Sequence, residues 1–204
     1  MRKESTEKRL ERIHSAAIRL ASQREVSAIS IYDVAKEAAI AASTVYHHYP
    51  NIEALICELM NSVFDDFEQV LDDAVVAEKV HHWSDINRMI EQSFVDYYRL
   101  APLAQHTLLG QHTYSSVRQA DAQNDLVLGK KVENIYRQYF TLPELPSDVN
   151  IFAIALQVAD KVYSMNYREN GDIAPEMARE AIVITEAYLG TYLPKQLPRA
   201  VTLN

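Results

Sequence analysis

Apolar residues recur at intervals of three and four along almost the whole chain, and the two-residue alternation typical of strands is nearly absent. Such spacing places the apolar side chains on one face of a helix. The longest stripe begins at Ile52 and continues through Leu55, Ile56, Leu59, Val63, Phe67, Val70 and Leu71. We therefore predict an all-α protein with about nine helices.

Three short helices are predicted in the first quarter of the chain. Ser30 forms a weak capping box with the aspartate three residues later, which opens the second helix. A turn near residues 39–41 leads to the third helix, which Pro50 ends because the residue before a proline avoids helical geometry. This is the arrangement of a helix-turn-helix unit. We predict a three-helix, helix-turn-helix DNA-binding domain over residues 1–50 and a helical domain over residues 51–204.

The third of these helices carries a run of hydroxyl and imidazole side chains. In a helix-turn-helix unit the third helix enters the major groove, where short hydroxyls and flat hydrogen-bonding groups meet base edges and phosphates. Val45 and Tyr49, four residues apart, are expected to face inward. On pattern alone, a solvated segment of an ordinary helical protein remains the alternative.

Residues 13–60 resemble the DNA-binding region of the TetR (tetracycline-repressor) family of bacterial transcriptional regulators. The most specific part is the run STVYHHYPN over residues 43–51, followed by Glu53-Ala54-Leu55. The resemblance implies that Thr44, Tyr46 and His47 make the main operator contacts. The further DNA-contacting residues that it implies are Ser43 and His48 close by, Ser30 and Tyr32 at the start of the second helix, and Lys36 with the Arg2-Lys3 arm as phosphate partners.

Four positions depart from the family pattern. Ala39 replaces the usual turn glycine, and Ala41 replaces the usual helix-capping residue. Ile52 stands where the family has a phosphate-binding lysine, and Tyr32 replaces a basic residue. Because these changes remove charged phosphate contacts, we predict weak non-specific DNA affinity with a shallow dependence on salt.

The resemblance also implies that the remaining helices bind a ligand and form a dimer. In residues 151–162 apolar side chains occupy nearly the whole helix circumference, as in a helix buried on both faces. The second face is expected to meet a partner subunit in a two-fold, four-helix interface, although a central helix of a monomer would show the same pattern. The predicted interface residues are Ile151, Ile154, Ala155, Val158, Val162, Ile184 and Tyr188.

Aromatic residues and histidines gather in the middle of the chain. Core packing explains most of them, but an apolar pocket with a few polar tips uses the same residue types. Our candidates for the lining of an effector pocket are Trp83, Phe94, Tyr97, Tyr98, His106 and Tyr136. Such a lining favours a small lipophilic organic effector.

Other functional classes are disfavoured by the sequence. The four glycines are at least nineteen residues apart, so neither common nucleotide-binding glycine motif can be written. No metal-ligand spacing of the HExxH type joins His81, His82, His106 and His112, and the lone Cys57 lies among apolar neighbours. We expect no catalytic residues, no metal and no cofactor.

Charge and hydropathy bear on location. The net charge is −8, yet residues 1–50 hold eight Lys or Arg against six Asp or Glu, which leaves −10 for the remainder. A mildly basic head on an acidic body is compatible with DNA binding. The single cysteine and the lack of any apolar run of about 18 residues indicate a cytoplasmic protein without a membrane span.

These observations predict a ligand-responsive, homodimeric transcriptional regulator. It would act as a repressor that binds an inverted-repeat operator in double-stranded DNA and is released by the effector. The alternative is a helical protein-interaction or effector-binding module whose DNA binding is weakened or lost, which the substitutions at Ala39 and Ile52 favour.

Overall fold

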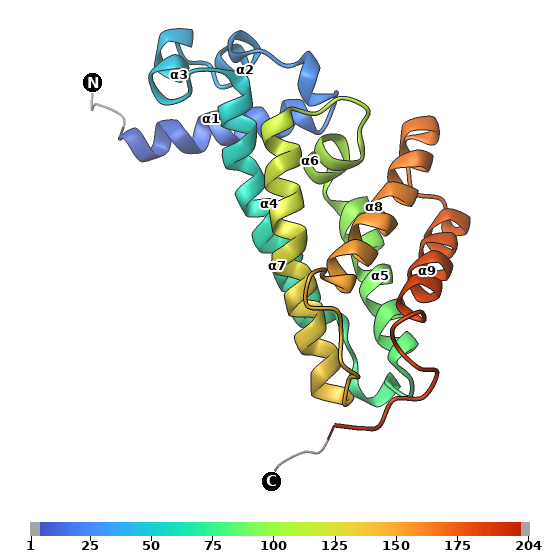
Figure 1. Cartoon of the computed structure of the whole chain (residues 1–204). Helices are drawn as coiled ribbons and strands as arrows, with labels where there is room; N and C mark the ends of the chain where they lie inside the picture. The colour runs from blue at the N-terminus through green and yellow to red at the C-terminus, as the bar shows by residue number, and fades with distance from the viewer. Residues whose placement is uncertain (1–4, 201–204) are drawn as a thin grey trace.

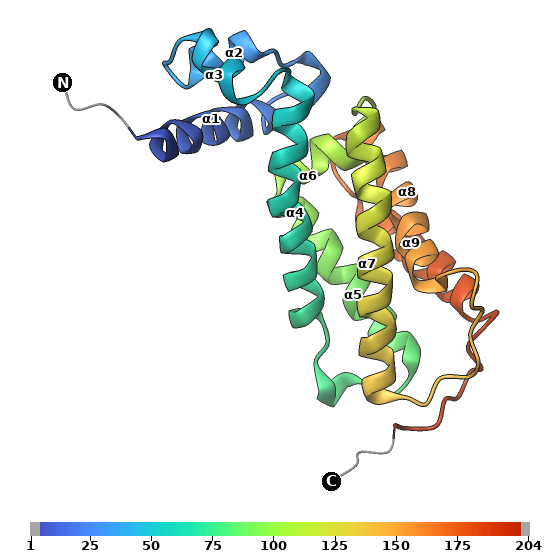
Figure 2. The same cartoon turned by 60° about the vertical axis from the view of Figure 1, so that its left-hand side comes forward.

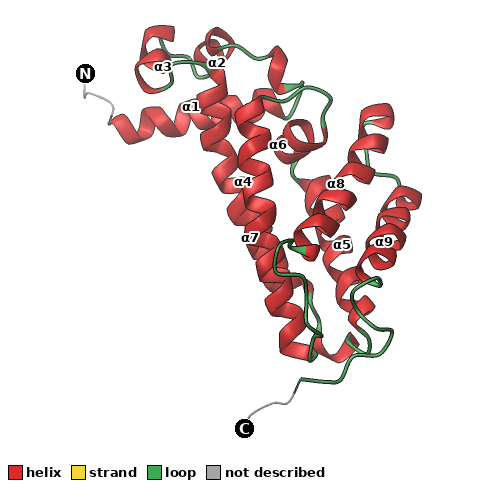
Figure 3. Ribbon diagram, viewed as in Figure 1, coloured by secondary structure: helices red, strands yellow, loops and turns green. Residues whose placement is uncertain are grey.

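A computed structural model describes residues 5–200, and it confirms the all-helical class (Figure 3). The nine α-helices of this part of the chain are α1 (Thr6–Ala21), α2 (Ile31–Glu37), α3 (Ala42–His48), α4 (Ile52–Ala74), α5 (Trp83–Leu100), α6 (Pro102–Ala104), α7 (Ser115–Tyr139), α8 (Ile151–Asn170) and α9 (Pro175–Leu189). Two 3₁₀ turns, η1 (Val26–Ala28) and η2 (Ala77–Lys79), and one π-helical turn, η3 (Gln105–Leu109), complete the order.

Helices α1 to α3 form a head at one end of the molecule (Figure 1). Ser30 caps α2 in the expected capping box with Asp33, and the Asn51 side chain accepts a hydrogen bond from the Ala54 amide at the start of α4. Helix α3 has no side-chain cap, because Ala41 occupies the capping position. The short helices are therefore set by local signals except at α3, whose position depends on packing.

The body is built around two long helices, α4 and α7, which lie side by side and both run away from the head (Figures 1 and 2). Helix α5 packs against α4, while α8 packs against α7 and α9 against both α5 and α8. Helix α4 therefore belongs to both parts, since its first turns contact α1 and its remaining length walls the body.

Two glycines serve this packing. A Cβ on Gly129 of α7 would lie 2.6 Å from the backbone nitrogen of Ala153, so the close approach of α7 and α8 requires glycine there. Gly171 ends α8 with a φ of 73°, in the left-handed region that glycine adopts without strain. Helix α5 begins at Trp83, where the Asp85 carboxylate accepts from the amides of His81 and His82.

Within the described residues, no helix has the length and apolarity to cross a bilayer.

Candidate functional site

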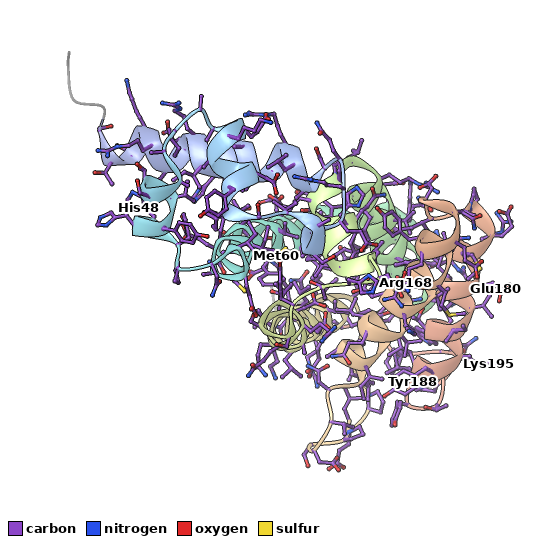
Figure 4. The ribbon with its side chains drawn as sticks, turned by 90° about the horizontal axis from the view of Figure 1, so that it is seen from above. His48, Met60, Arg168, Glu180, Tyr188 and Lys195 are labelled. Carbon is purple, nitrogen blue, oxygen red and sulfur yellow. The ribbon has the colours of Figure 1, made fainter. Side chains whose placement is uncertain are left out.

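Helix α3 is anchored by two side chains and presents the others outward. Val45 and Tyr49 are buried, as expected from their spacing. Ser43, Tyr46 and His47 are exposed. Thr44 and His48 are half-buried. Figure 4 shows His48 pointing outward at the side of the molecule opposite Glu180 of α9. The polar side chains thus form a continuous outer face, the geometry that a groove-reading helix needs.

The start of α2 adjoins this face. Tyr32 is 67% exposed, and its ring meets that of Tyr46 edge-on at a centroid distance of 6.0 Å. Ser30 is exposed, but its hydroxyl and its amide both donate to Asp33, at 2.7 Å and 2.9 Å, so Ser30 is engaged in capping α2. Lys36 is also exposed, whereas Arg2 and Lys3 lie outside the described residues. The contact between Tyr32 and Tyr46 therefore places the start of α2 beside the outer face of α3.

The turn between α2 and α3 is held by an interaction that the sequence did not reveal. Ala39 has a φ of 52°, a left-handed conformation that an L-residue with a Cβ adopts at a cost. The Arg12 guanidinium of α1 donates to the carbonyls of Ala38 and Ala39, at 2.5 Å and 2.9 Å. Arg12 therefore holds the turn in a conformation that a glycine at position 39 would adopt without strain.

We expect Ala39→Gly to stabilise the protein by about 1 kcal/mol, because glycine relieves the left-handed strain. Urea unfolding of the variant and the parent measures this difference. The matched control is Ala38→Gly, one residue earlier, where the φ of −75° is ordinary and glycine should destabilise. A loss of stability in Ala39→Gly would show that the turn is not strained.

Several cations of the head are engaged within the protein. Arg19 pairs with Glu37 at 2.8 Å, and Arg24 lies 3.3 Å from Asp33. Arg12 serves the turn, as described above. These interactions leave fewer side chains to neutralise phosphates, in keeping with the substitutions at Tyr32 and Ile52.

A titration of DNA binding against salt should therefore give a shallow slope. With four or fewer phosphate contacts per protein, a plot of log K against log salt should have a slope no steeper than about −4. Fluorescence anisotropy with a labelled duplex, at several potassium chloride concentrations, measures the slope. A value near about −8 would mean that the paired arginines are released to the DNA.

A cluster of hydrogen bonds joins the head to helix α4. The Tyr49 hydroxyl donates to Glu58 of α4 at 2.9 Å and lies 2.6 Å from His14 Nε2 of α1. His14 Nε2 is itself 3.2 Å from the Glu58 carboxylate. Burial and the charge of Glu58 raise the pKa of Tyr49. The cluster ties the residue that ends α3 to both α1 and α4.

Further contacts tie the head to the loop before α7. His112 Nδ1 lies 3.1 Å from Glu25, and the Tyr114 hydroxyl donates to the Val26 carbonyl at 3.4 Å. On the body side, Ser116 donates to Glu53 and lies 3.2 Å from the sulfur of Cys57. The head is thus coupled to both long helices of the body.

A second surface lies on α8 and α9, far from α3. Of the predicted interface residues, Ile151, Ala155 and Val162 are buried within the chain, because this side of α8 packs on α7 and α9. Ile154, Val158 and Tyr188 are half-buried, and Ile184 is exposed. The sequence did not single out Met165 and Val183, which are 54% and 57% exposed. We name Ile154, Val158, Met165, Val183, Ile184 and Tyr188 the α8–α9 surface.

The body encloses a cavity of about 10 Å³ between α4, α5, α7 and α8, room for about one water molecule. Its lining consists of Phe67, Glu91, Phe94, Tyr98, Asp125, Leu128, Leu156, Ala159, Asp160 and Tyr163. Phe94 and Tyr98 were predicted from the sequence. The three carboxylic acids were not, because an isolated acid on a helix face reads as a solvated residue.

The other four predicted pocket residues do not line this cavity. Trp83 donates to the Pro194 carbonyl at 3.0 Å, and the Tyr97 hydroxyl donates to Asp66 at 3.0 Å. His106 Nδ1 lies 3.1 Å from the Tyr167 hydroxyl, and the Tyr136 ring packs on Phe152. Each of these four side chains packs on a neighbouring element of the fold or forms a hydrogen bond with it. Within residues 5–200, no group of three or more His, Cys, Asp or Glu side chains can hold a metal ion.

The cavity acids are hydrogen-bonded to tyrosines. Glu91 is 2% exposed and accepts from the Tyr163 hydroxyl at 2.5 Å, and Asp160 accepts from the Tyr98 hydroxyl at 3.0 Å. Burial raises the pKa of Glu91 to about 7, against which the hydrogen bond from Tyr163 acts. Burial and the charge of Asp121 also raise the pKa of Asp125.

These pKa shifts make stability depend on pH. Between about pH 4 and pH 7 the folded protein holds protons that the unfolded chain has released, so the free energy of unfolding falls as pH rises through this window. We expect a loss of about 1–2 kcal/mol between about pH 5.5 and pH 8. Urea unfolding across this range measures it, and Glu91→Gln should flatten the profile. A profile that rises with pH would contradict the assignment.

A helix-turn-helix head that rests on an all-helical body defines a class, that of DNA-binding transcriptional regulators. Residues 13–59 match the family model described as bacterial regulatory proteins of the tetR family. The head of this chain is therefore similar to the DNA-binding region of the TetR family, and its helical fold is shared with solved TetR-family regulators.

Solved structures with this fold include relatives of low sequence identity. A TetR-family regulator from Streptomyces coelicolor has a TM-score of 0.67 at 20% identity, over 91% of this chain and 99% of that chain. SmeT, the repressor of the Stenotrophomonas maltophilia multidrug efflux pump SmeDEF, scores 0.63 at 14% identity, over 96% and 95%. The multidrug binding protein EbrR, complexed with imidazole, scores 0.61 at 19% identity, over 89% and 90%. Comparison with curated proteins gave no significant match.

Proposed function

We propose that the protein is a dimeric repressor that binds an inverted-repeat operator and is released by a small organic effector. Residues 1–50 form the DNA-binding domain, and residues 51–204 form the effector-binding and dimerisation domain. The observation that carries this proposal is the outer face of α3, which exposes Ser43, Tyr46 and His47 while Val45 and Tyr49 anchor the helix from behind. Thr44, His48, Ser30 and Tyr32 border the same face.

The exposed apolar side chains of the α8–α9 surface support dimerisation, which the proposed function requires. Apolar side chains such as Met165 and Val183 are exposed there, and pairing with a two-fold mate would cover them in a four-helix interface. The two α3 helices of such a dimer would project from the end opposite the interface helices. Two reading heads then meet half-sites one helical turn, or a multiple of it, apart.

The position of the cavity supports release by an effector. Its wall includes Phe67 of α4, and α4 is bridged to α3 through Glu58 and Tyr49. Because the cavity has a volume of about 10 Å³, an organic ligand must separate the surrounding helices to enter, which would displace α4. The effector shifts the equilibrium only by the difference in its affinity for the two arrangements. SmeT, a repressor, and EbrR, a multidrug binding protein, share the fold and agree with this proposal.

A selection from random duplexes followed by gel shift tests the proposal. We expect enrichment of an inverted repeat that binds one dimer. Enrichment of no sequence, by a protein that is folded and dimeric, would favour the alternative of an effector-binding or interaction module. The strained turn at Ala39 and the engaged arginines of the head are the features that would explain that outcome.

A further inference from the structure

We propose that the effector of this protein is an organic cation, a hydrophobic molecule with a permanent or protonated positive charge, held in the cavity between α4, α5, α7 and α8. The inference rests on the proposed effector-binding function of that cavity and specifies the chemical class of its ligand. Two independent features of the cavity wall, its aromatic rings and its carboxylic acids, point to the same class.

The aromatic part of the wall consists of Phe67, Phe94, Tyr98 and Tyr163, one from α4, two from α5 and one from α8. Phe67 meets Phe94 and Tyr98 at centroid distances of 5.5 Å each, and Tyr98 meets Tyr163 at 6.3 Å. Aromatic faces attract organic cations through the ring quadrupole and also accept their apolar groups.

The acidic part of the wall consists of Glu91, Asp125 and Asp160, and Asp121 lies close enough for its charge to act on Asp125 and Asp160. Glu91 and Asp125 are 2% and 6% exposed. The hydrogen bonds to Glu91 and Asp160 come from neutral groups. The Tyr163 hydroxyl donates to Glu91, and the Tyr98 hydroxyl donates to Asp160. Carboxylates this deeply buried are ordinarily paired with a cation.

No such partner is present in the described part of the chain. None of the ion pairs between residues 5 and 200 includes Glu91, Asp121, Asp125 or Asp160. Two cations of the surrounding helices are paired with other acids: Lys131 of α7 pairs with Glu68 and Asp72, and Arg88 of α5 pairs with Glu186. Three acids therefore share the cavity wall, with Asp121 nearby and no cationic side chain paired to them in the described residues. Protons compensate these acids at low pH, and a cation supplied from outside would compensate them once they ionise.

One further polar group lies near the same acids. The Tyr136 hydroxyl is buried without a hydrogen-bond partner among the described residues, and the charges of Glu91 and Glu186 act on it. An anionic or acidic ligand would add to the negative charge of this region. A neutral ligand would gain no electrostatic attraction from the acids. A cation would be attracted to them once they ionise and would reduce the repulsion among them.

A matched pair of probes tests the charge requirement directly. Benzyltrimethylammonium carries a permanent positive charge, and neopentylbenzene is its uncharged carbon isostere. Isothermal titration calorimetry on the full chain at about pH 8, above the pKa of about 7 of Glu91 and of Asp125, compares the two. We expect the cation to bind at least about tenfold more tightly than the isostere.

The variants Glu91→Gln and Asp125→Asn should each weaken binding of the cation by about tenfold and leave the isostere unaffected. Glu144→Gln, on the exposed loop after α7, removes the same charge from the surface and should change neither affinity. Circular dichroism establishes that each variant is folded. Lowering the salt concentration should not restore cation binding in either variant, because the carboxylate that each variant lacks lies in a buried site that salt screens little.

Equal or tighter binding of the isostere, or no binding of either probe, would overturn the proposed specificity. The proposed function is tested separately by the operator selection. If operator binding is found and the cation does not bind, only the ligand class is wrong. If the cation binds as expected and no operator is found, the cavity site stands and the repressor function fails.

Discussion

Val183→Asp should convert the protein to a monomer and weaken operator binding by about a hundredfold or more. Val183 is exposed in the single chain, so a carboxylate there does not disturb the fold, but it would be buried without a partner in the proposed dimer. Once the dimer is lost, the second head no longer binds at high effective concentration, and the gain from linking two heads is typically about 10²–10⁴. Analytical ultracentrifugation and fluorescence anisotropy measure the two effects.

The control is Val127→Asp, because Val127 of α7 is similarly exposed and lies outside the α8–α9 surface. It should stay dimeric and bind DNA normally. A dimeric Val183→Asp would show that the subunits pair elsewhere. A monomeric Val183→Asp with full operator affinity would show that dimerisation is not needed for DNA binding.

Thr44→Ala and Tyr46→Phe should weaken operator binding by about ten- to a hundredfold and leave the dimer intact. Each removes one hydroxyl from the outer face of α3, and a lost hydrogen bond of about 1 kcal/mol counts twice in a dimer with two heads. Anisotropy titration against the selected operator measures the loss, with sedimentation as the test of assembly.

Ser15→Ala serves as the matched control, since Ser15 of α1 is an exposed hydroxyl away from α3 and its loss should have no effect. Parallel loss of DNA binding and of stability in Thr44→Ala would mean that the half-buried Thr44 is structural. Unchanged operator affinity in both variants would remove α3 from the interface.

Much of the head could be predicted from the sequence because its signals are local. The Ser30 capping box, the proline after α3 and the spacing of Val45 and Tyr49 all act within a few residues, and the structure reproduces them. Arg12 at the turn could not be predicted. It reaches residues 26 and 27 positions away, and an arginine on a helix surface carries no sign of such a partner.

The body was less predictable for a related reason. Aromatic composition identified Phe94 and Tyr98 in the cavity wall, yet Trp83 and His106 have the same character and pack elsewhere. The acids from α5, α7 and α8 come together only through the packing of these helices. Each taken alone resembles a solvent-facing residue, so the acidic part of the cavity wall could not be predicted from the sequence.

Protection of the selected operator from hydroxyl radicals tests the central claim most directly, namely that α3 reads DNA as one of a pair of heads. The account predicts two protected patches on one side of the duplex, with centres one helical turn or a multiple of it apart. Both patches should disappear together in Val183→Asp. A single patch, or two patches that persist in a monomeric variant, would contradict the account.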